Sequence, residues 1–354
     1  MPKEKTAFVC NQCGANFPKW RGQCSECNEW NSLNEVRISK SSIRSNLTIA
    51  PSRSGFSGIS SKIHRLGDVS IRVASRLKSG FNEFDRVLGG GFVPGSSILL
   101  GGHPGAGKST LLLQTLCKLA QKYPALYVTG EESPEQVALR ANRLRLPADQ
   151  LHIMAETNLN LILESTNQIQ PAVLVVDSIQ VVHSELISSA PGSVSQLREC
   201  ASELTRFAKK NGIVLLLIGH VTKDGSLAGP KVLEHMVDSS ILIEGGSDSR
   251  YRTLRSKKNR FGAVNELGVF AMTDSGMCEV KNPSSIFLDR SEHISSGSAV
   301  VVTWEGTRPL LVEIQALVDD SSLGNPRRLA VGFEHNRLAM LLAVLSRHGG
   351  VQVA

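Results

Sequence analysis

The sequence predicts an α/β protein with a mostly parallel sheet flanked by helices, and two observations support this prediction. From about residue 72, short apolar runs alternate with longer helical stretches, the pattern of a sheet whose strands are joined by helices. A glycine-rich turn also follows one apolar run directly and leads into a helix. Strands are expected at six places: 97–100, 125–129, 151–154, 172–176, 213–218 and 239–243.

The glycine-rich turn fits the pattern G-x-x-x-x-G-K-[ST], and the helix after it carries apolar side chains at helical spacing. In such a P-loop, glycines let backbone N–H groups face phosphate oxygens, and the helix N-terminus adds partial positive charge. Lys108 is expected to neutralise the β/γ-phosphates, and the Ser109 hydroxyl to ligate Mg²⁺. The sequence therefore predicts a site for ATP or GTP with Mg²⁺. The expected nucleotide-binding residues are Gly102, His103, Pro104, Gly105, Ala106, Gly107, Lys108, Ser109 and Thr110.

Carboxylates follow two other predicted strands of the sheet. The apolar run 173–176 ends in Asp177, and a buried parallel strand would bring that carboxylate beside the P-loop, where it can hold Mg²⁺ through water. Glu131 and Glu132 follow the strand expected at 125–129, at the edge where ligands bind in such folds. One of the two is expected to position or deprotonate the attacking water. The spacing does not choose between them.

A cysteine-rich module precedes the core. Four cysteines form two C-x-x-C pairs separated by ten residues: Cys10, Cys13, Cys24 and Cys27. Their thiolates can complete a tetrahedron around one Zn²⁺, which would be structural because sulfur fills every position. Two disulfides or a redox dithiol are the alternatives, which the expected reducing compartment and the paired spacing disfavour. Trp20 and Trp30 flank the second pair, where they either pack against the metal knuckle or stack on bases.

The composition divides the chain into four predicted parts. With 354 residues, 41% of them hydrophobic, the chain is long enough for more than one domain. Residues 37–78 hold nine lysines and arginines against one acidic residue. Their net charge of +8 exceeds the +7 of the whole chain. This segment is either a solvated linker or a zone that contacts nucleic-acid phosphates. The four parts are a zinc module (1–34), a basic serine-rich linker (35–71), the ATPase core (72–282) and another α/β domain (283–354).

A cytoplasmic protein is expected. No apolar run approaches the roughly 20 residues that a membrane-spanning helix needs. The first five residues are mostly charged, unlike a signal peptide, and seven cysteines, four of them clustered, are typical of a reducing compartment.

Several stretches together resemble the bacterial RadA (Sms) family. Residues 79–91, before the P-loop, are similar to the segment that leads into RecA-type ATPase cores. The cysteine module and the stretches 128–133 and 219–225 also look like stretches of this family. The resemblance covers essentially the whole chain. A zinc module joined to a core with the following pentapeptide is its most specific part: Lys258, Asn259, Arg260, Phe261 and Gly262.

The resemblance implies a RecA-like P-loop ATPase core between a zinc-ribbon-like module and a Lon-protease-like domain. It implies a DNA-dependent, helicase-like ATPase of recombinational repair, which binds single-stranded and branched DNA and drives branch migration. A hexameric ring and the recombinase RecA are the implied partners. By the same resemblance, Glu131 rather than Glu132 is the catalytic carboxylate, and His220 is a sensor of the γ-phosphate.

Lys258 and Arg260 have two expected roles. In a ring, ATP lies between protomers, and these cations can reach across to stabilise charge on the γ-phosphate, as an arginine finger does. Alternatively they contact DNA together with the basic residues before them, or simply form a solvated basic strand. The spacing leaves these alternatives open.

Two other functions compete with the DNA-dependent motor. The part beginning near residue 283 resembles the start of the Lon-like domain, and by the family pattern it is expected to be incomplete at Ala354. That likeness suggests an ATP-dependent protease, but no serine stands in a recognisable Lon nucleophile setting. A nucleotide switch without hydrolysis is the other alternative, and Glu131 disfavours it.

Overall fold

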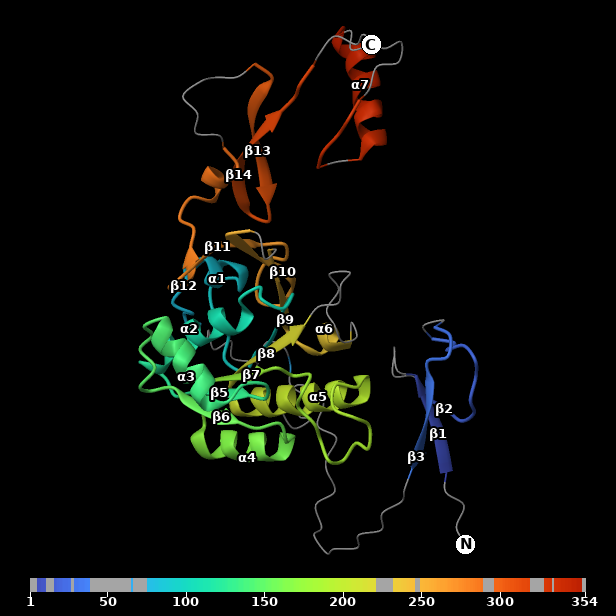
Figure 1. Cartoon of the computed structure of the whole chain (residues 1–354), viewed down its shortest axis with the longest axis vertical. Helices are drawn as coiled ribbons and strands as arrows, with labels where there is room; N and C mark the ends of the chain where they lie inside the picture. The colour runs from blue at the N-terminus through green and yellow to red at the C-terminus, as the bar shows by residue number, and fades with distance from the viewer. Residues whose placement is uncertain are drawn as a thin grey trace, which may run out of the picture. The chain divides into compact units, whose positions relative to one another are not determined.

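The computed structural model describes residues 5–10, 16–26, 29–38, 65, 75–220, 232–245, 249–288, 296–318, 328–332 and 334–351. The chain divides into two compact units, one of Met1–Pro283 with Trp304–Leu310 and one of Ser284–Thr303 with Leu311–Ala354 (Figure 1). Among these described residues, no helix combines the length and the apolar character that crossing a membrane requires.

The described part of the first unit contains a nine-stranded sheet in the order β12-β11-β10-β9-β4-β8-β7-β5-β6. The six strands from β9 to β6 in this order are parallel to one another. All six predicted strands are confirmed within two residues at each end. They are β4 (Ser97–Gly102), β5 (Ala125–Thr129), β6 (His152–Ala155), β7 (Val173–Asp177), β8 (Val214–His220) and β9 (Ser239–Glu244).

Three antiparallel strands extend the sheet beyond β9. They are β10 (Tyr251–Asn259), β11 (Leu267–Thr273) and β12 (Gly276–Glu279). Sequence analysis did not predict β11 and β12, because they are joined by a tight turn and interrupt the alternation of strand and helix. β10 returns along β9, so that Asn259 pairs with Ser239 at the start of β9.

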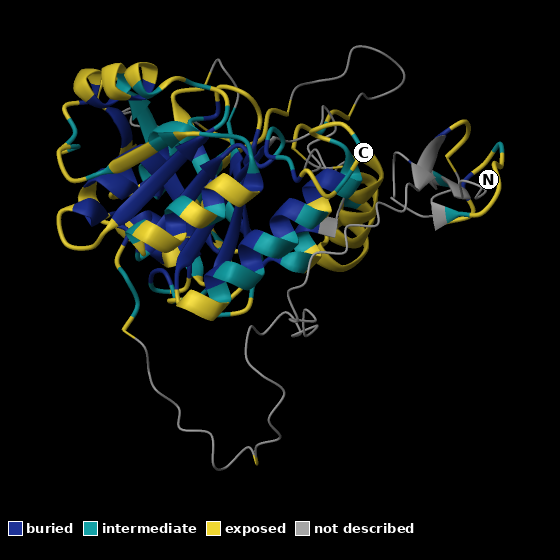
Figure 2. Cartoon of the chain, turned by 90° about the horizontal axis from the view of Figure 1, so that it is seen from below, coloured by how far each residue is buried: buried dark blue, intermediate teal, exposed yellow. Residues whose placement is uncertain are grey.

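Helices cover both faces of the sheet. On one face lie α1 (Asn82–Val87), α2 (Lys108–Ala120) and α3 (Pro134–Arg143). On the other lie α4 (Leu159–Ile169), α5 (Val194–Asn211) and α6 (Val232–Met236). Figure 2 shows the buried strands between helices whose outer faces are exposed. Apolar clusters on both sides of the strands therefore hold the three layers together.

Two helix boundaries lie at residues whose local sequence signals them. Ser133 and Gln136 form a capping box at the start of α3: the Gln136 N–H donates to Ser133 Oγ, and the Ser133 N–H donates to Gln136 Oε1. α5 ends where Gly212 adopts the left-handed conformation, with φ of 70°. The sequence analysis missed α4, which Asn158 caps with its side-chain oxygen.

The cysteine module forms a separate small sheet in the order β2-β1-β3. Its strands are β1 (Lys5–Cys10), β2 (Asn16–Phe17) and β3 (Leu33–Ile38). Cys10, Cys24 and Leu33 form a small buried cluster with Phe8 and Phe17 packed against it.

The second unit holds a 3₁₀ turn whose assigned span is Pro283–Ile286, most of β13 (Ser298–Glu305) and β14 (Arg308–Gln315), and α7 (His335–Gly349). The two strands coincide with apolar runs at 299–304 and 310–316 and pair with each other. Within α7, which is described throughout, no residue is buried.

Candidate functional site

The P-loop joins the buried strand β4 to the first turn of α2. Gly107, the N-cap residue of α2, has φ of 99°, and a Cβ there would lie 2.7 Å from Met272 Cε. Glycine is therefore required by both the backbone and the neighbouring side chain. Gly105 is also left-handed, with φ of 78°, and no atom of the described residues lies within 4 Å of a Cβ built on it. The loop thus has room for a phosphate where its backbone turns.

Lys108 extends back across this loop. Its Nζ donates to the carbonyl oxygens of Gly102 at 2.7 Å and His103 at 3.0 Å. Burial lowers the pKa of Lys108, while the nearby carboxylates of Asp177 and Glu131 act in the opposite direction. An ammonium held among neutral carbonyls at this site gains a stronger partner when an anionic phosphate enters.

The parallel strands bring the predicted carboxylates to the same edge as the P-loop. Thr129, the last residue of β5, pairs with Asp177, the last residue of β7. Asp177 is 8% exposed, and its Oδ2 accepts a hydrogen bond of 2.5 Å from the Tyr127 hydroxyl. Beyond the strand ends, Ser178 Oγ donates to Glu131 Oε1 at 2.5 Å. Asp177 and Glu131 are thus each oriented by a hydroxyl group.

Tyr127 and Ser178 were missed by the sequence analysis. Tyr127 interrupts the otherwise aliphatic start of β5 and is completely buried. A buried tyrosine hydroxyl usually needs a hydrogen-bond partner, so its position in an apolar strand was a usable signal. Ser178 follows the strand that ends in Asp177, and its sequence context carried no comparable signal.

Glu131 and Glu132 have different surroundings. Glu132 forms an ion pair with Arg140 of α3, and its N–H donates to Thr129 Oγ1 at 3.0 Å. Glu132 therefore ties α3 to the end of β5. Glu131 is exposed, contacts Ser178 and acts electrostatically on Lys108.

His220 is the last residue of β8, where its backbone pairs with Gly102. This pairing places position 220 at the same edge as the P-loop. The side chain of His220 and residues 221–231 lie outside the part of the chain that the structure describes.

The pentapeptide 258–262 lies at the opposite edge of the sheet from the P-loop. Asn259 pairs with Ser239, the first residue of β9, and Ser239 pairs with Ile98 near the start of β4. The P-loop follows the other end of β4. A strand of this length spans about 16 Å, so Lys258 and Arg260 lie far from the P-loop of their own chain.

Lys258 has its ammonium group at the C-terminal end of α6. Its Nζ donates to the carbonyl oxygens of Glu234 at 2.6 Å and Val237 at 2.7 Å, and lies 3.3 Å from that of His235. Burial and the neighbouring Arg260 cation lower the pKa of Lys258. These contacts satisfy carbonyls that a helix end leaves without partners. The ammonium group of Lys258 thus holds the C-terminal end of α6 in its own chain.

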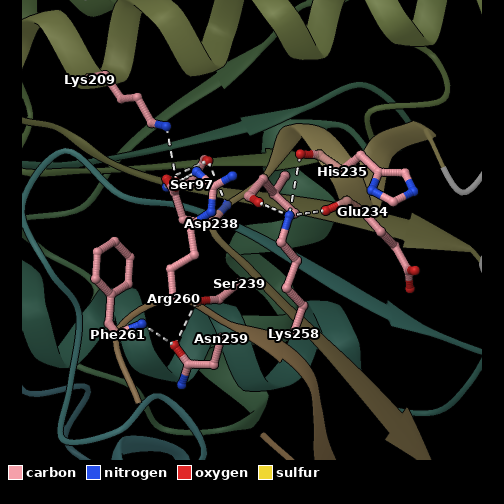
Figure 3. A network of polar contacts seen from close by, with 11 residues as sticks. Ser97, Lys209, Glu234, His235, Asp238, Ser239, Lys258, Asn259, Arg260 and Phe261 are labelled. Atoms are coloured by element: carbon pink, nitrogen blue, oxygen red, sulfur yellow. Dashed lines mark hydrogen bonds and ion pairs between the residues drawn. The ribbon is translucent and has the colours of Figure 1, made fainter. Parts of the chain in front are cut away.

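Asp238 is the centre of the network in Figure 3. Its Oδ2 accepts the N–H and the hydroxyl of Ser97, each at 3.0 Å, and its Oδ1 accepts Lys209 Nζ and Arg260 Nη1, each at 3.0 Å. Burial disfavours the carboxylate, but the hydrogen bonds from Ser97 and Lys209 outweigh it and lower the pKa of Asp238. The Arg260 side chain remains 56% exposed despite this contact.

The rest of the pentapeptide forms a tight turn. Asn259 Oδ1 accepts the Phe261 N–H at 2.9 Å and the Ser239 hydroxyl at 3.1 Å. The backbone at Gly262 approaches Gly89 so closely that a Cβ on Gly262 would lie 2.8 Å from Gly89 Cα. Glycine is therefore the residue that fits at both positions.

Two of the basic residues that precede the pentapeptide have partners within the chain. Arg252 is 5% exposed and donates to the carbonyl oxygen of Tyr251 at 2.9 Å. Arg255 donates to Glu305 Oε2 at 2.6 Å and lies 3.6 Å from Glu244. Both side chains therefore contact groups of the same chain, which disfavours the hypothesis that all these cations contact DNA.

One cysteine of each C-x-x-C pair lies in the described part of the module. Cys10 and Cys24 are both buried in its small core, as expected of thiolate ligands of a structural zinc. The Cys24 N–H donates to the Glu29 carbonyl at 3.0 Å. Cys13 and Cys27 lie outside the described residues. The burial of these two cysteines is compatible with the predicted zinc site, which stays a prediction.

Trp20 and Trp30 do not pack into the core of the module. Their exposed fractions are 57% and 67%, and the buried cluster of the module contains neither. Both rings come within 4 Å of a Cβ built on Gly22, beside the second cysteine pair, and packing against the metal knuckle stays a prediction.

Comparison with known proteins identifies the family. Residues 65–226 match the family described as AAA domain, and residues 8–35 match the family described as rubredoxin metal binding domain. A protein of Escherichia coli K12 named "DNA repair protein RadA" is 61% identical over 350 residues, covering 99% of this chain and 76% of that protein. The chain belongs to the RadA family. Proteins of the same name from Pseudomonas aeruginosa and Bacillus subtilis are 56% and 46% identical, each over 99% of this chain and 76% of the relative.

Membership of the RadA family confirms the predicted resemblance and the fold class. The fold is an α/β P-loop ATPase domain with a mostly parallel sheet, preceded by a zinc-ribbon module. The AAA domain of this RadA-family chain includes the P-loop, Glu131 and Asp177, and its metal-binding module includes all four predicted cysteine ligands.

Proposed function

We propose that this chain is a DNA-dependent ATPase of recombinational DNA repair, which binds single-stranded DNA and uses ATP hydrolysis to drive branch migration. The observation that carries the ATPase part is the single sheet edge that holds the P-loop, Asp177 and Glu131. The DNA part is supported by the name of the relatives, DNA repair protein RadA, and by the net charge of +7 of the chain. ATP, Mg²⁺ and a structural Zn²⁺ are the proposed cofactors. Branched DNA and RecA are the other proposed partners, and a cytoplasmic location stays a prediction.

The proposed roles follow from the contacts at this edge. Lys108 exchanges the carbonyls of Gly102 and His103 for phosphate oxygens. Mg²⁺, held by Ser109 and through water by Asp177, neutralises charge on the phosphates. Glu131, which Ser178 orients, accepts a proton from the attacking water. The γ-phosphate sensor role of His220 remains a prediction from the resemblance.

A second copy of the chain completes this site in our proposal. Arg260 lies at the opposite edge from its own P-loop, and its side chain is 56% exposed beside Asp238, so we assign it to a nucleotide on a neighbouring protomer. Lys258 supports this arrangement by holding the end of α6. Repeated around a ring, the same contact gives the hexamer that the resemblance implies.

Subunit mixing tests whether Arg260 acts on a neighbour. Arg260→Ala and Glu131→Gln chains are each expected to be inactive alone, since one lacks the cation and the other the carboxylate. Mixed in equal amounts, they should recover about a quarter of wild-type ATP hydrolysis, because that share of interfaces pairs an intact Glu131 with an intact Arg260. Absence of any recovery after proven subunit exchange would contradict action between protomers.

The proposed function is tested by ATP hydrolysis of the zinc-loaded chain with and without single-stranded DNA at two salt concentrations. We expect DNA to stimulate turnover, and the stimulation to fade at the higher salt because the contacts are with phosphates. A rate of ATP hydrolysis that does not change when DNA is added contradicts the proposal. Nucleotide binding without turnover favours a switch, and cleavage of a peptide substrate favours a Lon-type protease.

The predicted division into a zinc module (1–34), a linker (35–71), an ATPase core (72–282) and a Lon-like part (283–354) remains a proposal. Within the last part, exposed apolar side chains of α7 support the assignment to a Lon-like domain. Met340, Leu341 and Val344 are each more than half exposed. Such a stripe of helical neighbours normally packs against another element.

A further inference from the structure

Trp20 and Trp30 lie on either side of Gly22 in the zinc module. A Cβ on Gly22 would lie 3.6 Å from Trp30 Cζ3 and 3.8 Å from Trp20 Cη2, so the two indole rings approach the same position. Both rings nevertheless stay more than half exposed. The chain therefore presents two large aromatic surfaces together, in a module of about thirty residues.

The backbone beneath these rings is held by hydrogen bonds. The Asn31 N–H donates to the Gly22 carbonyl at 2.8 Å, and the Cys24 N–H donates to the Glu29 carbonyl at 3.0 Å. Gln23 and Trp30 also form an isolated antiparallel bridge. Because these contacts hold the backbone between the two tryptophans, the spacing of positions 20 and 30 is set before a planar ligand binds there.

The residues around the pair are polar and exposed. Lys19 and Arg21 flank Trp20, and the Arg21 guanidinium also lies 5.6 Å from the centre of the Phe17 ring. On the other side, Glu29 precedes Trp30 and is exposed as well. Cations are thus available beside Trp20, while a carboxylate stands beside Trp30.

We propose that Trp20 and Trp30 form a stacking site for unpaired bases of single-stranded nucleic acid, with Lys19 and Arg21 contacting its phosphates. This inference rests on the proposed DNA-binding function and assigns part of it to the zinc module. Bases stack on aromatic side chains irrespective of sequence, while cations follow the backbone. The Glu29 carboxylate repels phosphates, so the phosphate contacts are assigned to Lys19 and Arg21.

A protein partner fits this surface less well. Protein interfaces bury their aromatic anchors within a core depleted of charge. Here lysine, arginine and glutamate are the exposed sequence neighbours of the two tryptophans. A strand that stacks its bases and leaves its backbone in water tolerates such neighbours.

The test uses the full chain, loaded with zinc, with Trp304 replaced by phenylalanine. Since the sequence contains three tryptophans, the remaining emission then comes from Trp20 and Trp30. Addition of an oligo(dT) strand is expected to quench this emission as the bases stack. Fluorescence anisotropy of the labelled strand measures total binding in parallel.

Trp20→Ala and Trp30→Ala, each in this background, should weaken oligo(dT) binding about tenfold. The salt dependence should stay the same, because no phosphate contact is lost. Lys19→Ala combined with Arg21→Ala should instead reduce the salt dependence by about two released counterions. Trp304→Ala is the matched control and should bind oligo(dT) like the Trp304→Phe chain, and zinc content is measured for every variant.

The possible outcomes separate this inference from the proposed function. Normal DNA binding with unquenched emission, or with unchanged affinity in both variants, overturns the stacking site and leaves the proposed function standing. Failure of the Trp304→Phe chain and of the wild-type chain to bind any DNA overturns both. Shielding of the two tryptophans by RecA in the absence of DNA identifies a protein contact and also overturns the inference.

Discussion

Replacement of Glu131 by glutamine is expected to lower ATP turnover by about two to four orders of magnitude while nucleotide affinity stays unchanged. Glutamine keeps the size of the side chain and can still accept the hydrogen bond from Ser178, but it cannot take a proton from water. Turnover is measured as phosphate release, and affinity by titration with a fluorescent ATP analogue.

Glu132→Gln is the matched control for this prediction. Glu132 forms an ion pair with Arg140, so its replacement weakens a contact of α3 and leaves the proposed catalytic carboxylate in place. We expect that variant to retain most of its turnover. Full activity of Glu131→Gln, or an equal loss in both variants, would refute the role assigned to Glu131.

Asp238→Ala is expected to destabilise the core by about 3 to 5 kcal/mol. Asp238 is 3% exposed and accepts hydrogen bonds from Ser97, Lys209 and Arg260. Its removal leaves the Lys209 ammonium without the carboxylate, next to buried donors of Ser97. Denaturant unfolding of the wild type, of Asp238→Ala and of Asp274→Ala measures the loss, with Asp274 as an exposed control that should change stability little.

The loss of folding stability on replacing Asp238 should depend on pH. The pKa of Asp238 is lower in the folded chain than its ordinary value of 3.8, so ionised Asp238 favours folding above that value. This contribution falls as the pH drops from about 3.8 through the lowered folded pKa. The stability difference between wild type and Asp238→Asn should therefore be constant from pH 5 to 8 and shrink in acid. A difference that grows on acidification would contradict this assignment.

The parallel part of the sheet was predictable because each of its strands is buried on both faces. An uninterrupted apolar run such as Val173–Asp177 has few alternatives to a central strand once a P-loop precedes it. The helix boundaries at Ser133 and Gly212 were equally accessible, since capping depends on residues near in sequence. These features are local, and so is the information that specifies them.

The environment of the pentapeptide was not predictable in the same way. Its contacts join residues far apart in the chain, such as Lys209 with Asp238 and Arg76 with Phe261. No spacing rule brings these positions together before the sheet order is known. The resemblance pointed to both Lys258 and Arg260. The structure shows how they differ: Lys258 donates to backbone carbonyls at the end of α6, whereas the Arg260 side chain is largely exposed.

The hydrogen bond between Tyr127 and Asp177 has a consequence for how the chain can hold a hydrated metal ion. The Tyr127 hydroxyl is buried within β5 and donates to Oδ2 of Asp177, which sets the orientation of the carboxylate before any ligand binds. Oδ1 and the second lone pair of Oδ2 can still accept hydrogen bonds from water. Magnesium keeps much of its water shell, so a carboxylate of fixed orientation suits the contact through water that we propose. A tyrosine in the core of the protein thus preorganises the contact between Asp177 and the water shell of the proposed magnesium ion.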